Sequence, residues 1–235
     1  MFELNKLYNM DCLEAMKEIP DKYFELAIVD PPYGIGIGHK VNKTVTIVGG
    51  GARAFGGNSK RQGRQHKMCS KFYHPFDDSS TPDGEYFKEL KRVSKNQIIW
   101  GGNFFLDNLG ATSCIIVWDK GRRNMDQADC EIAWTSLKGQ SRIFEFKWNG
   151  MLQGDMKNKE QRFHPTQKPV ALYTWVINRF AKEGDKILDT HAGSGSCLIA
   201  AYDTGHDWLG FELDKFYYEK ACERIERHTD QMRLW

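Results

Sequence analysis

Four consecutive residues near the N-terminus, Asp30-Pro31-Pro32-Tyr33, combine types that could take part in chemistry. They follow the apolar run of residues 26–29, which predicts a buried strand. Proline lacks a backbone N–H, so Pro31 and Pro32 contribute carbonyl acceptors without competing donors, beside a carboxylate and an aromatic ring. An ordinary turn could hold these residues. A turn does not require all of them, in this order, at the end of a buried strand.

The segment KILDTHAGSGS, residues 186–196, predicts a short strand ending at Asp189, a glycine turn and a helix that begins near Ser196. Such a turn lets a ligand approach the backbone and directs helix N–H groups at a negatively charged ligand group. The dinucleotide-binding fingerprint does not fit, because Leu198 stands where its third glycine should be. Glu212, at the end of the next predicted strand, could accept hydrogen bonds from both hydroxyls of a ribose. These features favour a nucleoside carrying a small zwitterion as the ligand.

A third motif, HPTQKP at residues 164–169, comes directly before a predicted helix over 170–182. Pro169 suits the first turn of a helix. Thr166 and Lys168 stand at the N-terminal end of that helix, where the helix dipole favours a carboxylate. An ordinary proline-rich start of a helix would have the same pattern, so this motif carries weight only together with the other two.

The elements that would position these motifs alternate between short apolar runs and amphipathic stretches, which favours an α/β fold. A short N-terminal strand precedes Asp11, and without an internal repeat or a long linker residues 1–235 form one predicted domain. The strands predicted over 131–137 and 142–148 are close enough for a hairpin, which indicates an antiparallel edge on a parallel sheet. Further strands are predicted over residues 26–29, 97–100, 114–118, 186–188 and 208–211. Helices are predicted over residues 12–18, 84–93, 170–182, 196–204 and 215–228.

The composition favours a single soluble domain. The 235 residues are 40% apolar and carry a formal net charge of +2, so there is enough apolar material for one full core. Six cysteines without a C-x-x-C pair fit reduced thiols in the cytoplasm rather than a zinc ribbon or a redox motif. The apolar run at residues 114–118 is far too short to span a membrane. We therefore expect a soluble, cytoplasmic protein.

Residues 34–76 interrupt the alternation with a glycine-rich stretch that contains eight cations and no aspartate or glutamate. A long loop inside a compact domain is usually functional or disordered, and cations without counter-charges favour phosphate contacts. A solvated basic loop without function is the alternative. His66, Cys69 and His74 match no standard zinc spacing, so no metal site is predicted. The candidate phosphate-binding residues are Lys40, Lys43, Arg53, Lys60, Arg61, Arg64, Lys67 and Lys71.

Together, the three motifs resemble those of the S-adenosylmethionine-dependent DNA amino-methyltransferases. Their order, with DPPY first and the GxG turn near the C-terminus, resembles the circularly permuted β class of that family. The resemblance spans nearly the whole chain, from LYNMDCLEAMKEIPDKYFELAIVDPPYG through IIWGGNFF and IIVWDKG to GFELD. It implies a Rossmann-like methyltransferase fold: a doubly wound α/β fold with a mostly parallel, seven-stranded sheet and an antiparallel edge strand.

By this resemblance, the catalytic residues are Asp30, Pro31, Pro32 and Tyr33. The exocyclic amine of a base is a poor nucleophile, because its lone pair is delocalised into the ring. The Asp30 carboxylate and the Pro31 carbonyl would each accept one N–H and aim the lone pair at the sulfonium methyl group, while the carboxylate stabilises the developing positive charge. Tyr33 would stack on a base that has left the duplex. Asp before Pro-Pro-Tyr favours adenine N6, since the cytosine-N4 enzymes more often have Ser at this position.

The resemblance also implies an S-adenosylmethionine site around the glycine turn. Asp189 and the turn would lie under the methionine part of the cofactor, and Glu212 would accept from the ribose hydroxyls. The residues of the turn are Gly193, Ser194, Gly195 and Ser196.

Two further parts of the chain match cofactor-binding positions of the family. Thr166, Gln167 and Lys168 match the motif that closes over the methionine carboxylate. Asp11 matches the acid that accepts from the adenine amine of the cofactor. Asp11 could equally be a helix N-cap, with Glu14 completing a capping box, and one residue could serve both purposes.

Two features depart from the family pattern. The turn commonly reads D-P-F-x-G-S-G, and here Thr190 and His191 replace the Pro-Phe pair, which removes rigidity and an apolar wall. The target-recognition region of the β class would fall between the later strands and HPTQKP, where only residues 138–163 remain, which is short for sequence readout. We therefore expect the basic loop insertion over 34–76 to share the DNA contacts.

Other functions stay open on the sequence. One is a relic that holds DNA or the cofactor without turnover, although a relic has no need to keep DPPY intact. Another is an amino-methyltransferase acting on RNA or on protein glutamine, which Asp30 disfavours because the enzymes that methylate protein glutamine usually carry Asn there. Double-stranded DNA is the expected partner. A homodimer and a cognate restriction endonuclease are further partners that the resemblance suggests, and no residue of the sequence predicts either.

Overall fold

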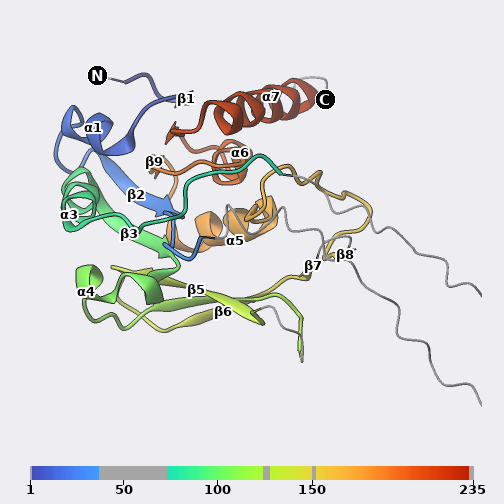
Figure 1. The fold of residues 1–235 in the computed structure, drawn as a ribbon, viewed down its shortest axis with the longest axis horizontal. Coiled ribbons are helices and arrows are strands. Elements are labelled where there is room, and N and C mark those ends of the chain that lie inside the picture. Colours follow the sequence, from blue (N-terminus) through green and yellow to red (C-terminus); the bar gives the residue numbers. More distant parts are fainter. Residues whose placement is uncertain (1, 37–72, 124–127, 150–151, 233–235) are drawn as a thin grey trace, which may run out of the picture.

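The computed structural model describes residues 2–36, 73–123, 128–149 and 152–232. Its strands are β1 (Lys6–Tyr8), β2 (Phe24–Val29), β3 (Ser94–Trp100), β4 (Ile115–Asp119), β5 (Cys130–Thr135), β6 (Arg142–Glu145), β7 (Trp148–Asn149), β8 (Leu152–Gln153), β9 (Ile187–Asp189) and β10 (Trp208–Phe211). Eight of these form one sheet in the order β1-β10-β9-β2-β3-β5-β4-β6 (Figure 1). The remaining two, β7 and β8, pair with each other as a short antiparallel ribbon.

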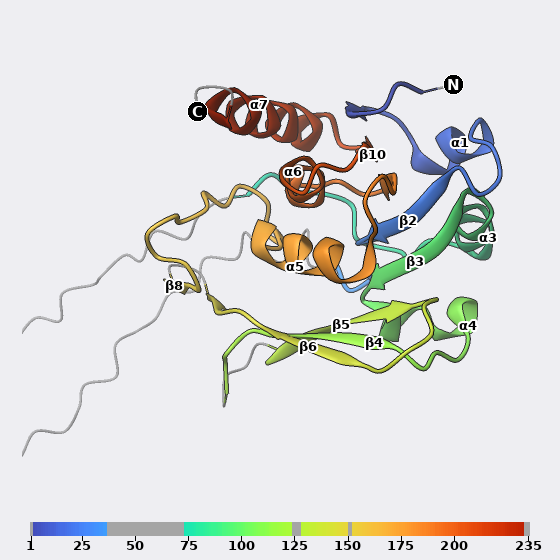
Figure 2. The same ribbon diagram turned by 180° about the vertical axis from the view of Figure 1, so that it is seen from behind.

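Helices cover both faces of the sheet (Figures 1 and 2). Those on one face are α1 (Cys12–Lys17), α3 (Gly84–Val93) and α4 (Leu106–Leu109), and those on the other are α5 (Val170–Phe180), α6 (Ser196–Asp203) and α7 (Lys215–Met232). In β2, Leu26 and Ile28 pack toward α5 and α6, whereas Ala27 and Val29 pack toward α1 and α3. A strand covered on both faces is apolar at successive positions, as this run is. The predicted doubly wound α/β fold is confirmed.

The predicted helices agree closely with the structure because their end signals are local. Asp11 caps α1 by accepting from Leu13 N at 2.7 Å, and Asp83 caps α3 by accepting from Tyr86 N at 3.1 Å. The last helix runs to Met232, beyond the predicted end at 228. The sequence did not predict α4 or the short 3₁₀ helix η1 (Gly102–Phe104), since neither is long enough to show a period.

The sheet differs from the prediction in its size and in its antiparallel part. The described residues form eight sheet strands rather than seven, and β5 lies inside the sheet, antiparallel to both β3 and β4. The predicted hairpin of 131–137 with 142–148 is wrong, because both edges of β5 are already paired and β6 joins the free edge of β4 in parallel. The segment 142–148 is also divided, since β6 ends at Glu145 and β7 begins at Trp148.

Because β5 runs opposite to its neighbours, its first residues lie at the end of the sheet where the parallel strands finish. β1, β10, β9, β2 and β3 run parallel, and β5 pairs antiparallel with both β3 and β4, so that β4 runs the same way as β3. Glu131 of β5 lies opposite Trp118 near the end of β4. The first residues of β5 therefore lie at the same end of the sheet as the carboxyl ends of the parallel strands.

None of the helices in the described part of the chain has the length and apolar character that crossing a membrane requires.

Candidate functional site

Three carboxyl groups from distant parts of the sequence lie at the carboxyl ends of neighbouring strands. Asp30 directly follows β2, Asp189 is the last residue of β9, and Glu212 directly follows β10. Because β10, β9 and β2 are adjacent and parallel, these side chains lie together at the carboxyl ends of the strands. Open α/β sheets bind ligands at this end of the sheet.

Asp30 has a partner on each oxygen of its carboxylate. The Tyr33 hydroxyl donates to Oδ1 at 2.5 Å, and the Lys168 ammonium pairs with Oδ2. Lys168 Nζ also lies 3.2 Å from the Tyr33 hydroxyl oxygen. The structure thus brings DPPY and HPTQKP into direct contact. The sequence predicts Lys168 at a carboxylate of the ligand, whereas the structure places its ammonium on the carboxylate of Asp30.

Glu131 completes this cluster, and no motif in the sequence pointed to it. Its Oε2 lies 3.1 Å from Lys168 Nζ, and its Oε1 pairs with Lys120. Burial would raise the pKa of Glu131, but the Lys168 and Lys120 ammoniums outweigh burial and lower that pKa to about 2. Burial would lower the pKa of Lys168, but Asp30 and Glu131 raise it above its usual value. Glu131 and Lys168 are therefore both ionised at neutral pH.

The ring of Tyr33 is positioned by the GGNFF segment after β3. Gly101 has a φ of +67°, and a Cβ built there would lie 2.2 Å from Tyr33 Cε1, so only glycine leaves room for the ring. Phe104 stacks on Tyr33 with the ring centroids 4.9 Å apart and 14° between the planes. Phe104 is 44% exposed. Phe104 therefore lies against the ring that is predicted to stack on the base, and in the sequence analysis it stood only within the stretch IIWGGNFF.

The glycine turn is built around the carboxylate of Glu212. Gly193 N donates to Oε2 at 2.8 Å and Asp214 N donates to Oε1 at 2.9 Å, which leaves each oxygen further acceptor capacity. Burial raises the pKa of Glu212. Gly193 and Gly195 have φ values of +52° and +73°, and a Cβ built at Gly193 would have its nearest neighbour 3.9 Å away, at His164 Nε2. The backbone at Gly193 is thus approachable, and the neighbouring acceptor suits ribose hydroxyls, so these residues fit S-adenosylmethionine.

Ser194 and Ser196 are buried in the turn and share a contact of 3.0 Å between their hydroxyl oxygens. Arg224 of α7 donates from Nη1 to Ser194 O and to Ser196 Oγ, both at 2.8 Å. Its Nη2 pairs with Glu160 Oε2 at 2.6 Å, and Glu160 Oε1 accepts from Val170 N at 2.9 Å. Arg224 and Glu160, which the sequence analysis missed, therefore tie the turn to the start of α5.

Asp189 and the two residues after it form a buried, hydrogen-bonded segment. Burial, with the charges of Asp30 and Glu212, raises the pKa of Asp189 to about 8, although His191 N donates to its Oδ1 at 3.1 Å. Thr190 Oγ1 lies 2.7 Å from the Tyr86 hydroxyl and 3.0 Å from His191 Nδ1. Burial lowers the pKa of His191 to about 4, so its imidazole is neutral. Thr190 is thus braced by a hydrogen bond to α3, and His191 by hydrogen bonds to Thr190 and Asp189.

The polar side chains of HPTQKP mostly stabilise their own loop. Thr166 Oγ1 lies 3.1 Å from His164 Nδ1, and Gln167 Oε1 accepts from Phe163 N at 3.2 Å. Trp148 Nε1 donates to the Gln167 carbonyl at 2.8 Å. Burial lowers the pKa of His164 to about 3, so this ring is also neutral. Only the Lys168 side chain of the predicted trio reaches Asp30.

Asp11 lies in the loop between β1 and α1, where it accepts from Leu13 N, so the predicted N-cap is confirmed. The predicted capping box does not form among the described residues, because the Glu14 carboxylate pairs with Lys17 instead of Asp11 N. Glu14 pairs with Lys17 Nζ at 2.7 Å.

The eight basic residues predicted to bind DNA lie outside the described residues, as do His66 and Cys69. His74 is described, and its ring stacks on Phe216 with the centroids 4.4 Å apart.

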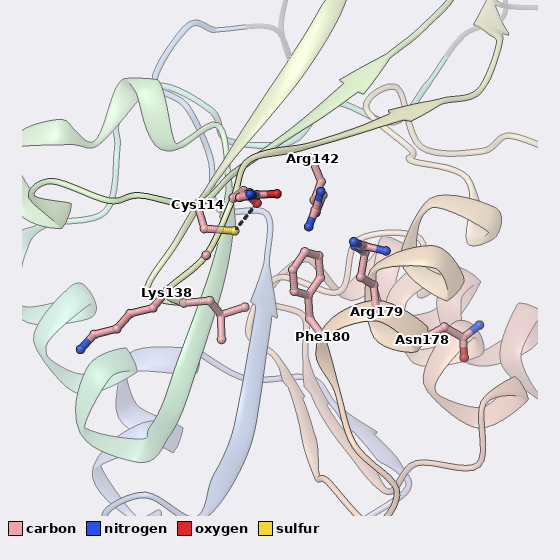
Figure 3. Close-up of a pocket in the computed structure, with 9 residues that line it drawn as sticks. Cys114, Lys138, Arg142, Asn178, Arg179 and Phe180 are labelled. Atoms are coloured by element: carbon pink, nitrogen blue, oxygen red, sulfur yellow. Dashed lines mark hydrogen bonds between the residues drawn. The ribbon is translucent and has the colours of Figure 1, made fainter.

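The structure divides the predicted recognition region 138–163. Residues 138–141 belong to the connection from β5 to β6, at the end of the sheet opposite Asp30, whereas the described residues 146–149 and 152–163 follow the end of β6, which lies at the same end of the sheet as Asp30. Near that opposite end is a cavity of about 490 Å³, where Arg142 and Arg179 approach each other beside Phe180 (Figure 3). This cavity is therefore separate from the cluster around Asp30.

Comparison with known proteins agrees with this geometry. The family model N6_N4_Mtase, described as DNA methylase, matches residues 115–223, just under half of the chain. The match includes HPTQKP, the glycine turn and Glu212. Type II methyltransferase M.HpaI of Haemophilus parainfluenzae is 39% identical over 69 residues, which are 29% of this chain and only 22% of that relative.

Two solved structures resemble the whole fold. The M1.HpyAVI–SAM complex has a TM-score of 0.54 at 18% identity, over 93% of this chain and 98% of that chain. The PvuII DNA methyltransferase (cytosine-N4-specific) has a TM-score of 0.55 at 15% identity, over 96% of this chain and 90% of that chain. Residues 115–223 are thus similar to the DNA methylase family of the N6/N4 type, and the two solved structures share the fold of the whole chain. The two solved structures confirm the predicted fold.

Proposed function

We propose that this protein transfers a methyl group from S-adenosylmethionine to the exocyclic N6 amine of an adenine flipped out of double-stranded DNA. The observation that carries the proposal is the position of Asp30. This carboxylate stands at the end of β2, beside the strand that leads into the glycine turn, and contacts Tyr33 and Lys168. All three motifs therefore surround one acceptor group.

The chemistry assigned to DPPY follows from its acceptors. The Asp30 carboxylate and the Pro31 carbonyl each accept one N–H of the amine, which makes the nitrogen tetrahedral and aims its lone pair. When bound, S-adenosylmethionine would supply an electrophilic methyl group on its sulfonium sulfur and would leave as S-adenosylhomocysteine. The charge of Asp30 stabilises the positive charge on the amine, an effect worth several kcal/mol in a preorganised site. One amine proton must then leave, and Asp30 is the base within reach.

The cofactor contacts proposed for this chain use the residues around the turn. Glu212 accepts from the ribose hydroxyls, and Asp11 accepts from the adenine amine of the cofactor. The backbone from Gly193 to Ser196, with Asp189 beneath it, receives the methionine part. Thr166 and Gln167 shape the loop beside this part of the site.

Adenine is the proposed target because Asp precedes Pro-Pro-Tyr, and cytosine N4 is the alternative. Labelled S-adenosylmethionine should be incubated with the protein and with DNA, RNA or protein substrates. The DNA should then be digested to nucleosides and analysed by mass spectrometry. Label in N6-methyladenine supports the proposal, and label in N4-methylcytosine contradicts the choice of base. Label in RNA or protein alone, or cofactor binding without transfer, contradicts DNA methylation itself.

The basic residues of 34–76, with the region 138–163, are proposed to contact the DNA. Phosphate contacts carry little sequence information, so neutralising Lys60, Arg61 and Arg64 together should weaken binding to many sequences alike. Binding weakens as salt increases, and each lost contact should make the plot of log K against log salt less steep by about one unit. Fluorescence anisotropy at several salt concentrations measures both quantities. An unchanged affinity and slope would remove this stretch from the DNA interface.

A further inference from the structure

The proposed function requires Asp30 to accept an N–H of the target amine, yet this carboxylate already has two partners. Tyr33 donates to Oδ1, and the Lys168 ammonium pairs with Oδ2. An ammonium on Asp30 weakens it as an acceptor and opposes the positive charge that develops on the amine. Efficient transfer therefore requires the ammonium to leave Asp30 as the amine binds.

Lys168 cannot leave Asp30 for water without a large rearrangement. Its side chain is only 3% exposed, and Nζ lies 5.6 Å from the ring centroids of both Tyr33 and Trp100. Pro169, the next residue, is the N-cap of α5, which fixes the backbone on which Lys168 stands. A buried ammonium without a carboxylate would be strongly unfavourable. The ammonium must therefore keep a carboxylate partner at every stage.

Glu131 offers such a partner within reach. Its buried Oε2 lies 3.1 Å from Lys168 Nζ, and no other described residue donates a hydrogen bond to this oxygen. Its other oxygen is held by Lys120, which anchors the side chain. Glu131 reaches this edge because β5 runs against its neighbours. The site thus contains a fixed carboxylate with a spare acceptor beside the ammonium that has to move.

We propose that Glu131 is a positioning residue that takes the Lys168 ammonium from Asp30 when the target amine binds. The exchange rests on the proposed function, because the amine is what displaces the ammonium. It conserves the charge of the cluster, since the carboxylates of Asp30 and Glu131 remain balanced by Lys168 and Lys120 throughout. Lys168 returns to Asp30 when the methylated base leaves.

The test compares single-turnover rates of methyl transfer in three variants. Glu131→Gln keeps the shape of the side chain and removes its charge, so Lys168 stays on Asp30. We expect the rate to fall at least about tenfold, while cofactor and DNA affinities measured by calorimetry and anisotropy stay within about twofold. In Glu131→Gln/Lys168→Met the competing ammonium is absent, so the double variant should be at least about fivefold faster than Glu131→Gln. Glu25→Gln is the matched control.

Glu25 suits this purpose because it also pairs with two lysines, Lys95 at 2.9 Å and Lys186 at 4.0 Å, and its side chain is 23% exposed against 25% for Glu131. It lies near the start of β2, away from Asp30, and should leave the rate unchanged. A double variant no faster than Glu131→Gln overturns the exchange, as does a full rate in Glu131→Gln. The wild-type protein in the same series tests the proposed function separately, because absence of methylated DNA there rejects the function whatever the ratio between variants.

Discussion

Replacing Gly101 with alanine tests whether the position of Tyr33 controls the reactivity of Asp30. The new Cβ would lie 2.2 Å from Tyr33 Cε1, and the ring would have to move. Movement removes the stacking on Phe104, about 0.5–1.5 kcal/mol. It also removes the hydrogen bond from the Tyr33 hydroxyl to the charged Asp30, about 1.5–3 kcal/mol. The left-handed φ of +67° adds about 1–2 kcal/mol for any residue with a Cβ.

Gly205→Ala provides the control for backbone strain. Gly205 has a φ of +73° and no atom within 4 Å of a Cβ built there, so this variant has the strain without the clash. The difference between the two variants in the free energy of unfolding, measured by urea titration, should be about 2–4.5 kcal/mol. Turnover should fall at least about tenfold in Gly101→Ala only, with unchanged cofactor affinity. Equal turnover in the two variants would refute the idea that Tyr33 must lie where it does.

Three further variants test the roles assigned to the carboxyl groups. Asp30→Ala should abolish methyl transfer in the label assay and leave cofactor affinity within a few-fold, because the lost acceptor acts on the target amine; near-normal turnover would reject its role. Glu212→Ala should weaken cofactor binding in calorimetry by about 1.5–3 kcal/mol, since the ribose hydroxyls lose a charged acceptor, and unchanged affinity would move the ribose site elsewhere. Asp189 has a pKa of about 8 in the folded protein and about 3.9 in an unfolded chain, so the folded state holds a proton that the unfolded state releases. Its contribution to stability should therefore decline as pH rises from about 4 to about 8, and urea titrations should show this decline in the wild type relative to Asp189→Asn, whereas parallel curves would contradict the raised pKa.

Much of the local structure could be predicted because its causes lie within a few residues. The start of α1 depends on Asp11, whose carboxylate reaches Leu13 N two residues away. The buried run of β2 is recognisable because both faces of that strand are covered, so its apolar residues are continuous. The candidate acceptor Asp30 and the glycine turn were likewise visible, since the types and order of their residues carry the chemistry.

The pairing of distant elements could not be predicted in the same way. The choice of β4 rather than β5 as the partner of β6 depends on which strand edges are already occupied, and no local period records this. Glu131 stands in an ordinary apolar strand and acquires meaning only because β5 is reversed and brings it to Lys168. Lys168 itself lies 138 residues from Asp30 along the chain.

The sequence by itself determined which groups could accept protons, bend the backbone or begin a helix, because these are properties of single residues and their close neighbours. Only the tertiary structure decided that Lys168 contacts Asp30, and that Glu131 stands beside Lys168. The physical reason is that a buried charge must be balanced within a few ångströms. Which charges come that close depends on how the sheet is assembled.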